Sequence, residues 1–270
     1  MRSSLKADRV NLQSYSRYFS LIDVQARMSL RADASRMYLG YLWWTLEPLL
    51  YVAVFYLVFG VILSSGRADF LLFLACGKLP FMWFSGSVNT ASNAMLNAKG
   101  LIGQSRLPKV LFPLARVQEG VYRQTTVFCV LILLLLASGV EISASWLWLF
   151  PIMLVQYLII VPCAILAALL VCVARDFMRV VSLGTVFLLF VSGIFWDVRD
   201  VASVETQYLI LAVNPLAFIL DAYRQALLYG AAPDGIHLLM LGAAGLVASF
   251  FAMKLVSRLD QWIALRVLSS

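Results

Sequence analysis

The chain has 270 residues, of which 62% are hydrophobic and 13% are charged. Soluble domains are about half apolar and about one quarter charged, so this composition excludes a soluble globular protein and predicts an integral membrane protein. The formal net charge of +7 is interpreted as a mark of membrane orientation, because no basic patch is interleaved with the aromatic motifs of nucleic-acid-binding proteins.

The N-terminal segment, residues 1–40, is basic and weakly amphipathic. Such a segment predicts a helix that lies on the cytoplasmic leaflet ahead of the first membrane span. Arg27 and Arg31 lie four residues apart, and Asp23 lies one turn before Arg27 as an ion-pair partner. The predicted apolar stripe of this helix contains Phe19, Ile22, Ala26, Leu30 and Met37.

Six later segments are apolar enough to cross a bilayer, which takes roughly 20 residues of helix. They form a transmembrane domain over 41–256 and leave 257–270 as a cytoplasmic tail. The third segment is weak in its first half, where Arg116, Glu119 and Arg123 recur at helical spacing, and the fifth segment is short. The predicted spans are 41–63, 70–88, 114–137, 146–174, 180–196 and 236–256.

The charged residues of the connections indicate the orientation of these spans. Most of the 21 Lys and Arg residues fall in the N-terminal segment, in the connection 89–113, in the turn before the fifth span and in the tail. The opposite connections are richer in Asp and Glu. Because cytoplasmic connections carry an excess of basic residues, this sorting predicts an even number of spans with both termini in the cytoplasm.

Two connections are predicted to contain structure of their own. Residues 89–113, on the cytoplasmic side, continue the second span and then form a short helix and a turn, because Gly and Pro residues punctuate them. On the outer side, the apolar piece 208–213 is followed by Asn214 and Pro215, a favourable N-cap and first residue for an amphipathic helix over 216–229. Two short apolar pieces broken at Asn-Pro predict a re-entrant or interfacial helical hairpin.

Residues typical of catalysis and metal binding are scarce. No Gly-x-x-x-x-Gly-Lys-Ser/Thr loop is present, so the chain has no usual nucleotide site. The single histidine, His237, lies at the outer end of the last predicted span and is interpreted as an interfacial residue. The four cysteines lack metal-type spacing and are interpreted as small buried hydrophobes. We therefore expect no catalytic, cofactor-binding or metal-binding residue, and no enzymatic activity of the chain's own.

Four blocks of sequence, in order along the chain, carry a family resemblance. They are RMYLGYLWWTLEPLL at 36–50, GKLPFMWF at 77–84, the segment 93–113 and NPLAFILDAYRQALLYG at 214–230. With these blocks the chain resembles the membrane permeases of ATP-binding-cassette exporters for bacterial surface polysaccharides, over about residues 20–256. The chain departs from the family pattern at Ala34-Ser35 and at 103–105, where the family is more basic or aromatic.

The resemblance implies an all-α integral membrane protein with six transmembrane helices, an N-terminal interface helix, a cytoplasmic coupling helix and a periplasmic re-entrant hairpin. It implies a homodimer in the bacterial inner membrane, with a channel between the two copies. It also implies two separate ATPase subunits on the cytoplasmic face, which would hold ATP and Mg²⁺ and drive a lipid-linked polysaccharide (O-antigen or capsule) outward. No cofactor is expected in this chain, and no nucleic-acid partner.

Because the chain lacks a nucleotide site, force has to reach it through contacts with the ATPase subunits. We expect these contacts at a coupling helix within 93–107 and at the N-terminal helix. An ordinary positively charged loop and a helix bound to anionic lipid headgroups are the respective alternatives. The predicted contact residues are Asn97, Lys99, Gln104, Arg106, Arg27 and Arg31.

Aromatic side chains are predicted to line the channel, because sugars present apolar C–H faces to them. Lipid-facing or core packing is the alternative for each ring. The candidates are Tyr51, Phe55, Tyr56, Phe59, Phe187, Phe190 and Trp196.

Gate residues are predicted at both ends of the channel. Glu47, inside the first span, requires a cationic partner, and Arg175 or Arg123 is the candidate. At the outer end, Asp221 and Arg224 are three residues apart on one helix and are predicted to pair. A purely structural pair and an interfacial anchor are the alternatives.

Three other functions stay open from the sequence. An exporter of the same architecture could carry teichoic acid, another lipid or a drug, and neighbouring genes would distinguish these cargoes. A membrane-embedded transferase would need catalytic His or acidic residues at a membrane face, and the single His237 argues against it. A self-sufficient secondary transporter would not co-purify with an ATPase subunit.

Overall fold

The structure, a computed structural model, describes residues 2–62, 69–104 and 107–269 of the chain, without the side chains of 2–17, 59 and 60. The predicted roles of Arg106 and of the Phe59 ring therefore lie outside the described residues. Every regular element within the described ranges is a helix, and no strand occurs among them. The prediction of an all-α fold is confirmed to this extent.

Five helical segments are long and apolar enough to cross a membrane. The first, Gly40–Val58, continues through three elements, and its last turns wind as a π-helix. The first segment consists of η1 (Gly40–Leu42), α2 (Trp43–Phe55) and the start of η2 (Tyr56–Ile62). The second is α3 (Phe70–Ser92) and the third is α6 (Leu111–Ala137). The fourth is η3 (Ala144–Trp148) with α7 (Leu149–Val173), and the fifth is α11 (Gly235–Arg258).

The predicted fifth span, 180–196, differs from this expectation. It corresponds to α8 (Phe177–Val191), an apolar helix of 15 residues that is shorter than a full membrane span. The helix stops because the chain turns at Gly193, whose φ of +71° is a backbone conformation that favours glycine. The predicted span therefore extends five residues beyond Val191, where the observed helix ends.

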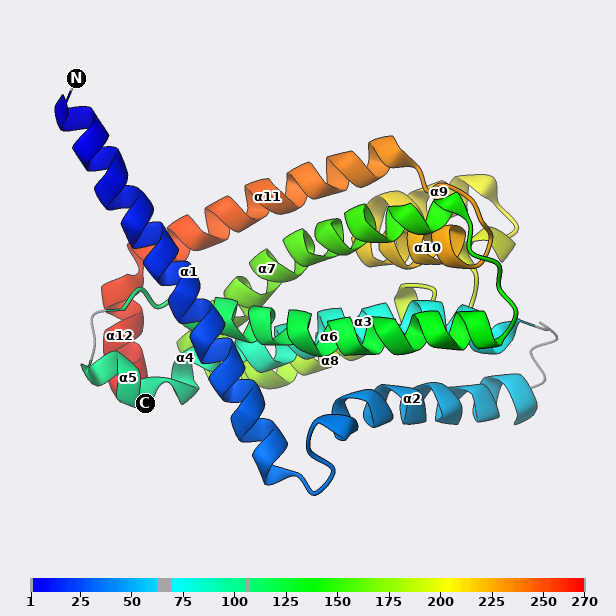
Figure 1. The fold of residues 1–270 in the computed structure, drawn as a ribbon, viewed down its shortest axis with the longest axis horizontal. Coiled ribbons are helices and arrows are strands. Elements are labelled where there is room, and N and C mark those ends of the chain that lie inside the picture. Colours follow the sequence, from blue (N-terminus) through cyan, green and yellow to red (C-terminus); the bar gives the residue numbers. More distant parts are fainter. Residues whose placement is uncertain (1, 63–68, 105–106, 270) are drawn as a thin grey trace.

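The N-terminal helix α1 (Arg2–Arg36) runs obliquely across the bundle and lies against α6 (Figure 1). Its buried stripe contains Ala26 and Leu30, as predicted, and continues to Ala34. Phe19, which was also predicted on this stripe, is 70% exposed. The two alanines of the stripe allow α1 to lie close to α6.

Three short helices gather at one end of the bundle (Figure 1): α4 (Ala94–Asn97), α5 (Lys99–Gln104) and the C-terminal α12 (Asp260–Ser269). The ion pair between Lys109 and Asp260, with a separation of 2.9 Å, ties the connection after α5 to α12. The Asp260 carboxylate also accepts a hydrogen bond from the Lys109 backbone N–H. Both chain termini lie at this end of the bundle.

The opposite end holds the predicted hairpin, made of η4 (Val198–Asp200), α9 (Val204–Val213) and α10 (Pro215–Leu227). The predicted N-cap is confirmed, because the Asn214 side chain accepts hydrogen bonds from the N–H groups of Leu216 and Ala217. Every residue from Leu216 to Leu227 is buried, against α3, α7, η3 and α9. The helix is therefore part of the core, although its sequence alternates as an amphipathic helix does.

Helices α7 and α11 pack closely through small residues. A Cβ atom on Gly245 would lie 3.0 Å from the Leu158 carbonyl oxygen, so no larger residue fits there without movement. Ser249, one turn later, donates a hydrogen bond to the same carbonyl at 3.3 Å. Small residues spaced four apart are typical of helix contacts within membranes, where close backbone approach supplies much of the attraction.

Candidate functional site

The charged face of α6 meets α1 in a network of ion pairs. Glu119 is almost completely buried and accepts hydrogen bonds from Arg116 at 2.7 Å and from Arg123 at 2.6 Å. Arg123 also pairs with Asp33 of α1 at 2.6 Å, and Arg116 donates to Ser29 of α1. The three charged residues that weaken the third predicted span therefore face a helix of the same chain, which compensates their charges.

A second contact fixes α1 farther toward its N-terminus. The Tyr122 hydroxyl donates a hydrogen bond to Asp23, and this bond lowers the pKa of the Asp23 carboxyl below its usual range. Arg27 forms the predicted ion pair with Asp23 at 3.0 Å, and its side chain is 64% exposed. Arg31 is exposed as well. Both predicted ATPase-contact arginines are thus accessible on α1.

The predicted coupling residues lie together at the α5 end of the bundle. Asn97, Lys99 and Gln104 are all exposed there. Leu101, between them, is also half exposed, while Ile102 is buried. This arrangement gives the segment one side that holds it to the bundle and one side that a partner can reach.

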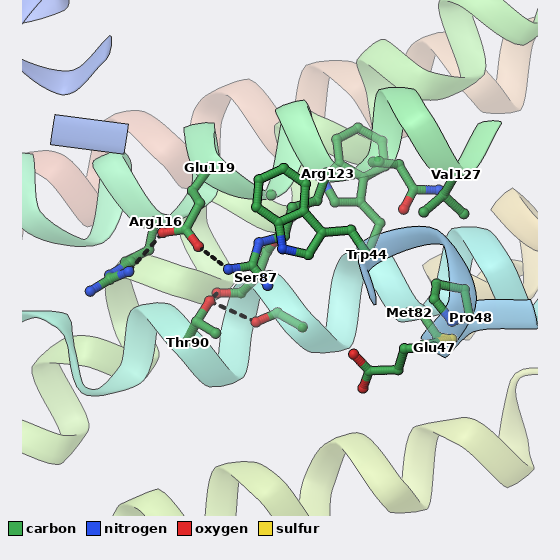
Figure 2. Close-up of a pocket in the computed structure, with 14 residues that line it drawn as sticks. Trp44, Glu47, Pro48, Met82, Ser87, Thr90, Arg116, Glu119, Arg123 and Val127 are labelled. Carbon is green, nitrogen blue, oxygen red and sulfur yellow. Dashed lines mark hydrogen bonds and ion pairs between the residues drawn. The ribbon is translucent and has the colours of Figure 1, made fainter. Parts of the chain in front are cut away.

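Next to the ion-pair network is a cavity of about 270 Å³ between α2, α3 and α6. Figure 2 shows Trp44 of α2 beside Arg123. The guanidinium carbon of Arg123 lies over the Trp44 indole, 5.2 Å from the ring centre. Glu47 and Arg116 contribute charge to the wall. The lining residues are Trp44, Glu47, Pro48, Met82, Trp83, Gly86, Ser87, Thr90, Arg116, Glu119, Gly120, Arg123, Gln124 and Val127.

Several polar groups in this wall lack partners. Among the described residues, five buried side-chain nitrogen or oxygen atoms have no hydrogen-bond partner. Four of the five belong to residues of this cavity, namely Trp44 Nε1, Trp83 Nε1, Ser87 Oγ and Arg123 Nε. A buried polar group without a partner costs about 1–3 kcal/mol, so such a concentration in one place requires an explanation.

The predicted aromatic residues of the channel meet in part. The Phe55 ring of α2 lies 4.9 Å from that of Phe195, which lies 5.7 Å from Phe190 of α8. Lys78, on α3, places its ammonium 5.1 Å from the Phe55 ring centre and 5.3 Å from that of Tyr51. Phe55 thus contacts both Lys78 of α3 and the aromatic pair of Phe190 and Phe195.

The other channel candidates lie at the edge of this cluster. The Trp196 indole donates a hydrogen bond to the Phe190 carbonyl at 2.9 Å. Phe187 is 65% exposed, and Tyr56 is partly exposed. Their rings are available to lipid, to a second copy of the chain or to a ligand.

The inner gate pair that the sequence predicted is arranged differently. Arg123 is engaged by Glu119 and Asp33, and no ion pair joins it to Glu47 among the described residues. Arg175 lines a different cavity together with Arg266. Among the described residues no ion pair joins Glu47 to Arg123 or to Arg175, and Arg123 is already paired with Glu119 and Asp33.

The outer gate pair is also different from the prediction. Asp221 pairs with Arg199, at 3.0 Å and 3.1 Å, and this hydrogen bonding raises the pKa of the Arg199 guanidinium. Arg224 is turned instead toward α3 and the end of α8, where it donates hydrogen bonds to the carbonyls of Phe73, Gly193 and Ile194. Three backbone carbonyls accept from its planar, five-donor guanidinium, so Arg224 does not pair with Asp221.

Arg224 also joins two of the sequence blocks that carry the family resemblance. A Cβ atom on Gly77 would collide with the Arg224 guanidinium, so the glycine of the second block makes room for the arginine of the fourth. Tyr223 donates to Gln156 at 2.7 Å, and Gln156 donates to the Pro80 carbonyl at 2.8 Å. The two blocks therefore recognise each other through a buried polar network.

Sequence reasoning missed several of these residues. Gln156 stands within a long apolar run, and that isolated polar position is a signal that could have marked it. Arg199 is one of few basic residues in an acidic connection, which is the corresponding signal for its pairing with Asp221. Lys109 and Asp260 are 151 residues apart, and no local sequence pattern predicts their contact.

These features define a class of protein: a helical, multi-pass membrane protein with an N-terminal helix bound to its third span and exposed polar residues on α4 and α5, at the end that holds both termini. No protein-family model matches the chain. It is 28% identical over 214 residues to the O-antigen export system permease protein RfbA of Klebsiella pneumoniae, which covers 78% of this chain and 82% of the relative.

Two further relatives cover more of the chain. The O-antigen export system permease protein RfbA of Myxococcus xanthus is 25% identical over 242 residues, 88% of this chain and 92% of the relative. The polysialic acid transport protein KpsM of Escherichia coli is 26% identical over 239 residues, 84% of this chain and 88% of the relative. The homologues are therefore polysaccharide-export proteins, and the predicted resemblance is confirmed.

Proposed function

We propose that the chain is the transmembrane permease subunit of an ATP-driven exporter that moves lipid-linked polysaccharide, O-antigen or capsule, across the bacterial inner membrane. The observation that carries this proposal is the similarity to O-antigen export permeases over up to 88% of the chain. The five apolar spans and the exposed coupling segment agree with it. ATP and Mg²⁺ would be held by two separate ATPase subunits.

The proposed topology has six crossings with both termini in the cytoplasm. Helix α8 is the sixth crossing, although its 15 residues extend only about 22 Å at 1.5 Å per residue. The buried hairpin α9–α10 would complete the passage on the outer side. Support comes from the termini, which lie at the same end of the bundle as an even number of crossings requires (Figure 1).

The proposed channel lies between two copies of the chain. Only 11% of an 18-residue stretch of Gly40–Val58 is buried, against 72% of one in α3, so the first span has a large face for a second copy or a substrate. Tyr51 and Phe55 on this span, with Phe190 on α8, would form the aromatic wall over which a sugar chain slides. Glu47, Arg175, Asp221 and Arg224 remain the proposed gate residues, and the last two act through the contacts described above.

The first test is deletion of the gene. We expect surface polysaccharide to disappear while lipid-linked polymer accumulates on the inner side of the membrane, because synthesis continues without export. Antibody labelling of intact cells and extraction of lipid-linked polymer measure the two pools. Wild-type gene supplied in trans is the control and should restore both; unchanged surface polysaccharide in the deletion strain would falsify the proposal.

The second test concerns the aromatic wall. The double variant Tyr51→Ala, Phe55→Ala is expected to slow export about tenfold, the effect of about 1.4 kcal/mol on a rate-limiting barrier. Pulse labelling of the polymer followed by surface detection measures the rate. The matched control is Phe250→Ala, Phe251→Ala on α11, whose rings are 58% and 62% exposed and distant in sequence from the cluster. Equal rates in the two double variants would remove the sliding surface from the proposal.

A further inference from the structure

The cavity between α2, α3 and α6 lies at the ends of three spans. Trp44 and Glu47 belong to the first turns of α2, Thr90 to the last turn of α3, and Arg116 to the early turns of α6. Glu47 is exposed and also lines the cavity, so a molecule outside the chain can reach the lumen. These positions place the cavity at the depth where lipid headgroups lie.

The groups without partners in this wall are mostly donors. Trp44 Nε1, Trp83 Nε1 and Arg123 Nε each carry one N–H that no described residue accepts, and Ser87 Oγ adds a hydroxyl. Trp83 and Ser87 are 5% and 3% exposed, so bulk water does not solvate them. Buried indole N–H groups ordinarily have an acceptor. The site therefore favours a group with several acceptor oxygens, as a phosphate has.

The charged residues of the cavity wall further restrict which group can bind there. Two arginines, Arg116 and Arg123, face two carboxylates, Glu47 and Glu119, so the formal charges balance. Glu119 is fully engaged by both arginines, whereas Glu47 has no ion pair among the described residues. An isolated anion would meet a wall without net positive charge. A zwitterion offers phosphate oxygens to the donors and an ammonium to Glu47.

We propose that this cavity binds the headgroup of a zwitterionic phospholipid with a primary amine, a phosphoethanolamine group. The phosphate accepts hydrogen bonds from Trp44, Trp83 and Arg123, and the ammonium lies against Glu47. Pro48, Met82 and Val127 supply apolar wall for the adjoining part of the lipid. The four unpartnered atoms are closed to solvent, so the headgroup reaches them by displacing the Trp44 ring, which is only half buried.

The consequence for the molecule is a lipid bridge between the loosely held first span and the core. This inference is independent of the proposed export function, since it concerns the chain's own membrane environment. Its test likewise uses the purified full-length chain in detergent, without ATPase subunits or polysaccharide. A negative result there leaves the deletion test untouched, and a negative deletion test leaves this result standing.

The experiment measures binding by native mass spectrometry and by the change in tryptophan fluorescence. The probes are short-chain phosphatidylethanolamine, phosphatidylcholine and phosphatidylglycerol, with inorganic phosphate to distinguish a free anion. We expect phosphatidylethanolamine to bind at least tenfold more tightly than the other three. Trp83→Phe and Trp44→Phe, which remove one N–H each and keep an aromatic ring, should each weaken it several-fold, and Glu47→Gln should abolish the preference over phosphatidylglycerol.

The matched control is Trp146→Phe. Trp146 also has a buried indole nitrogen without a partner, but it does not line the cavity, so this variant should bind as the wild type does. Equal affinity for all three lipids, tighter binding of inorganic phosphate, no binding because water alone fills the cavity, or equal losses in Trp83→Phe and Trp146→Phe would each overturn the proposal. If Trp83→Phe fails to fold, the proposal is still tested by Glu47→Gln, an exposed position, through its preference for phosphatidylethanolamine over phosphatidylglycerol.

Discussion

Replacing Arg224 with methionine is expected to lower the thermal stability of the folded chain. The Arg224 side chain is 1% exposed and donates to three backbone carbonyls, those of Phe73, Gly193 and Ile194. Methionine fills much of the same volume but leaves the carbonyls of Gly193 and Ile194, which lie outside any helix, without a donor, whereas the Phe73 carbonyl keeps its hydrogen bond within α3. Each unsatisfied buried acceptor costs about 1–3 kcal/mol, so a loss of at least about 2 kcal/mol follows.

Thermal unfolding of the purified protein in detergent measures this effect. For a chain of this size, about 2 kcal/mol corresponds to a fall in Tm of at least about 4 °C. Arg224→Lys keeps the charge but replaces a planar fork by a single ammonium, so its Tm should lie between those of the wild type and Arg224→Met. Arg266→Met is the control, because the exposed Arg266 makes one hydrogen bond, to Val173. Equal Tm values for the two methionine variants would refute the structural role of Arg224.

The second large effect is expected from Glu119→Gln. This change removes the carboxylate that compensates Arg116 and Arg123, so two positive charges face each other with only Asp33 between α1 and α6. Breaking a buried ion pair costs about 3–5 kcal/mol, and the lower value applies because both arginines are about one-third exposed. We expect α1 to separate from α6 more often while the spans stay folded.

Hydrogen exchange of α1 reports this loosening directly. Backbone amides between Asp23 and Asp33 should exchange at least tenfold faster in Glu119→Gln than in the wild type, while amides of α7 should be unchanged. Glu205→Gln on the exposed start of α9 is the matched control and should leave both regions as they are. Unchanged exchange in α1 would mean that its apolar stripe and its remaining polar contacts with α6 hold the helix without Glu119.

The sequence predicted the membrane class, most of the spans and the Asn214 cap, because each depends on residues that are close together in the chain. Periodicity and capping are local properties. The length of α8 was overestimated because hydropathy does not register a backbone turn such as that at Gly193. The full burial of α10 could not be predicted either, since it depends on which helices surround it.

The candidate sites show the same division between local and distant information. Exposure of the coupling residues followed from their polar character, and the pairing of Asp23 with Arg27 followed from helical spacing. The partners of Asp221, Arg123 and Arg224 come from distant elements, and spacing along one helix pointed to the wrong pair for Asp221. Four sequence blocks, taken together, predicted the family better than any one residue predicted its own contact.

The uneven burial of the spans has a mechanical consequence. Helix α10 is buried on all sides, and Arg224 joins it to α3 while Tyr223 joins it to α7, so we expect the end of the bundle that holds α10 to be stiff. The first span has few neighbours, and its last turns follow a π-helical path. If the proposed ATPase subunits push on α5, the first span is therefore expected to swing against this stiff part and to bend at its π-helical turns.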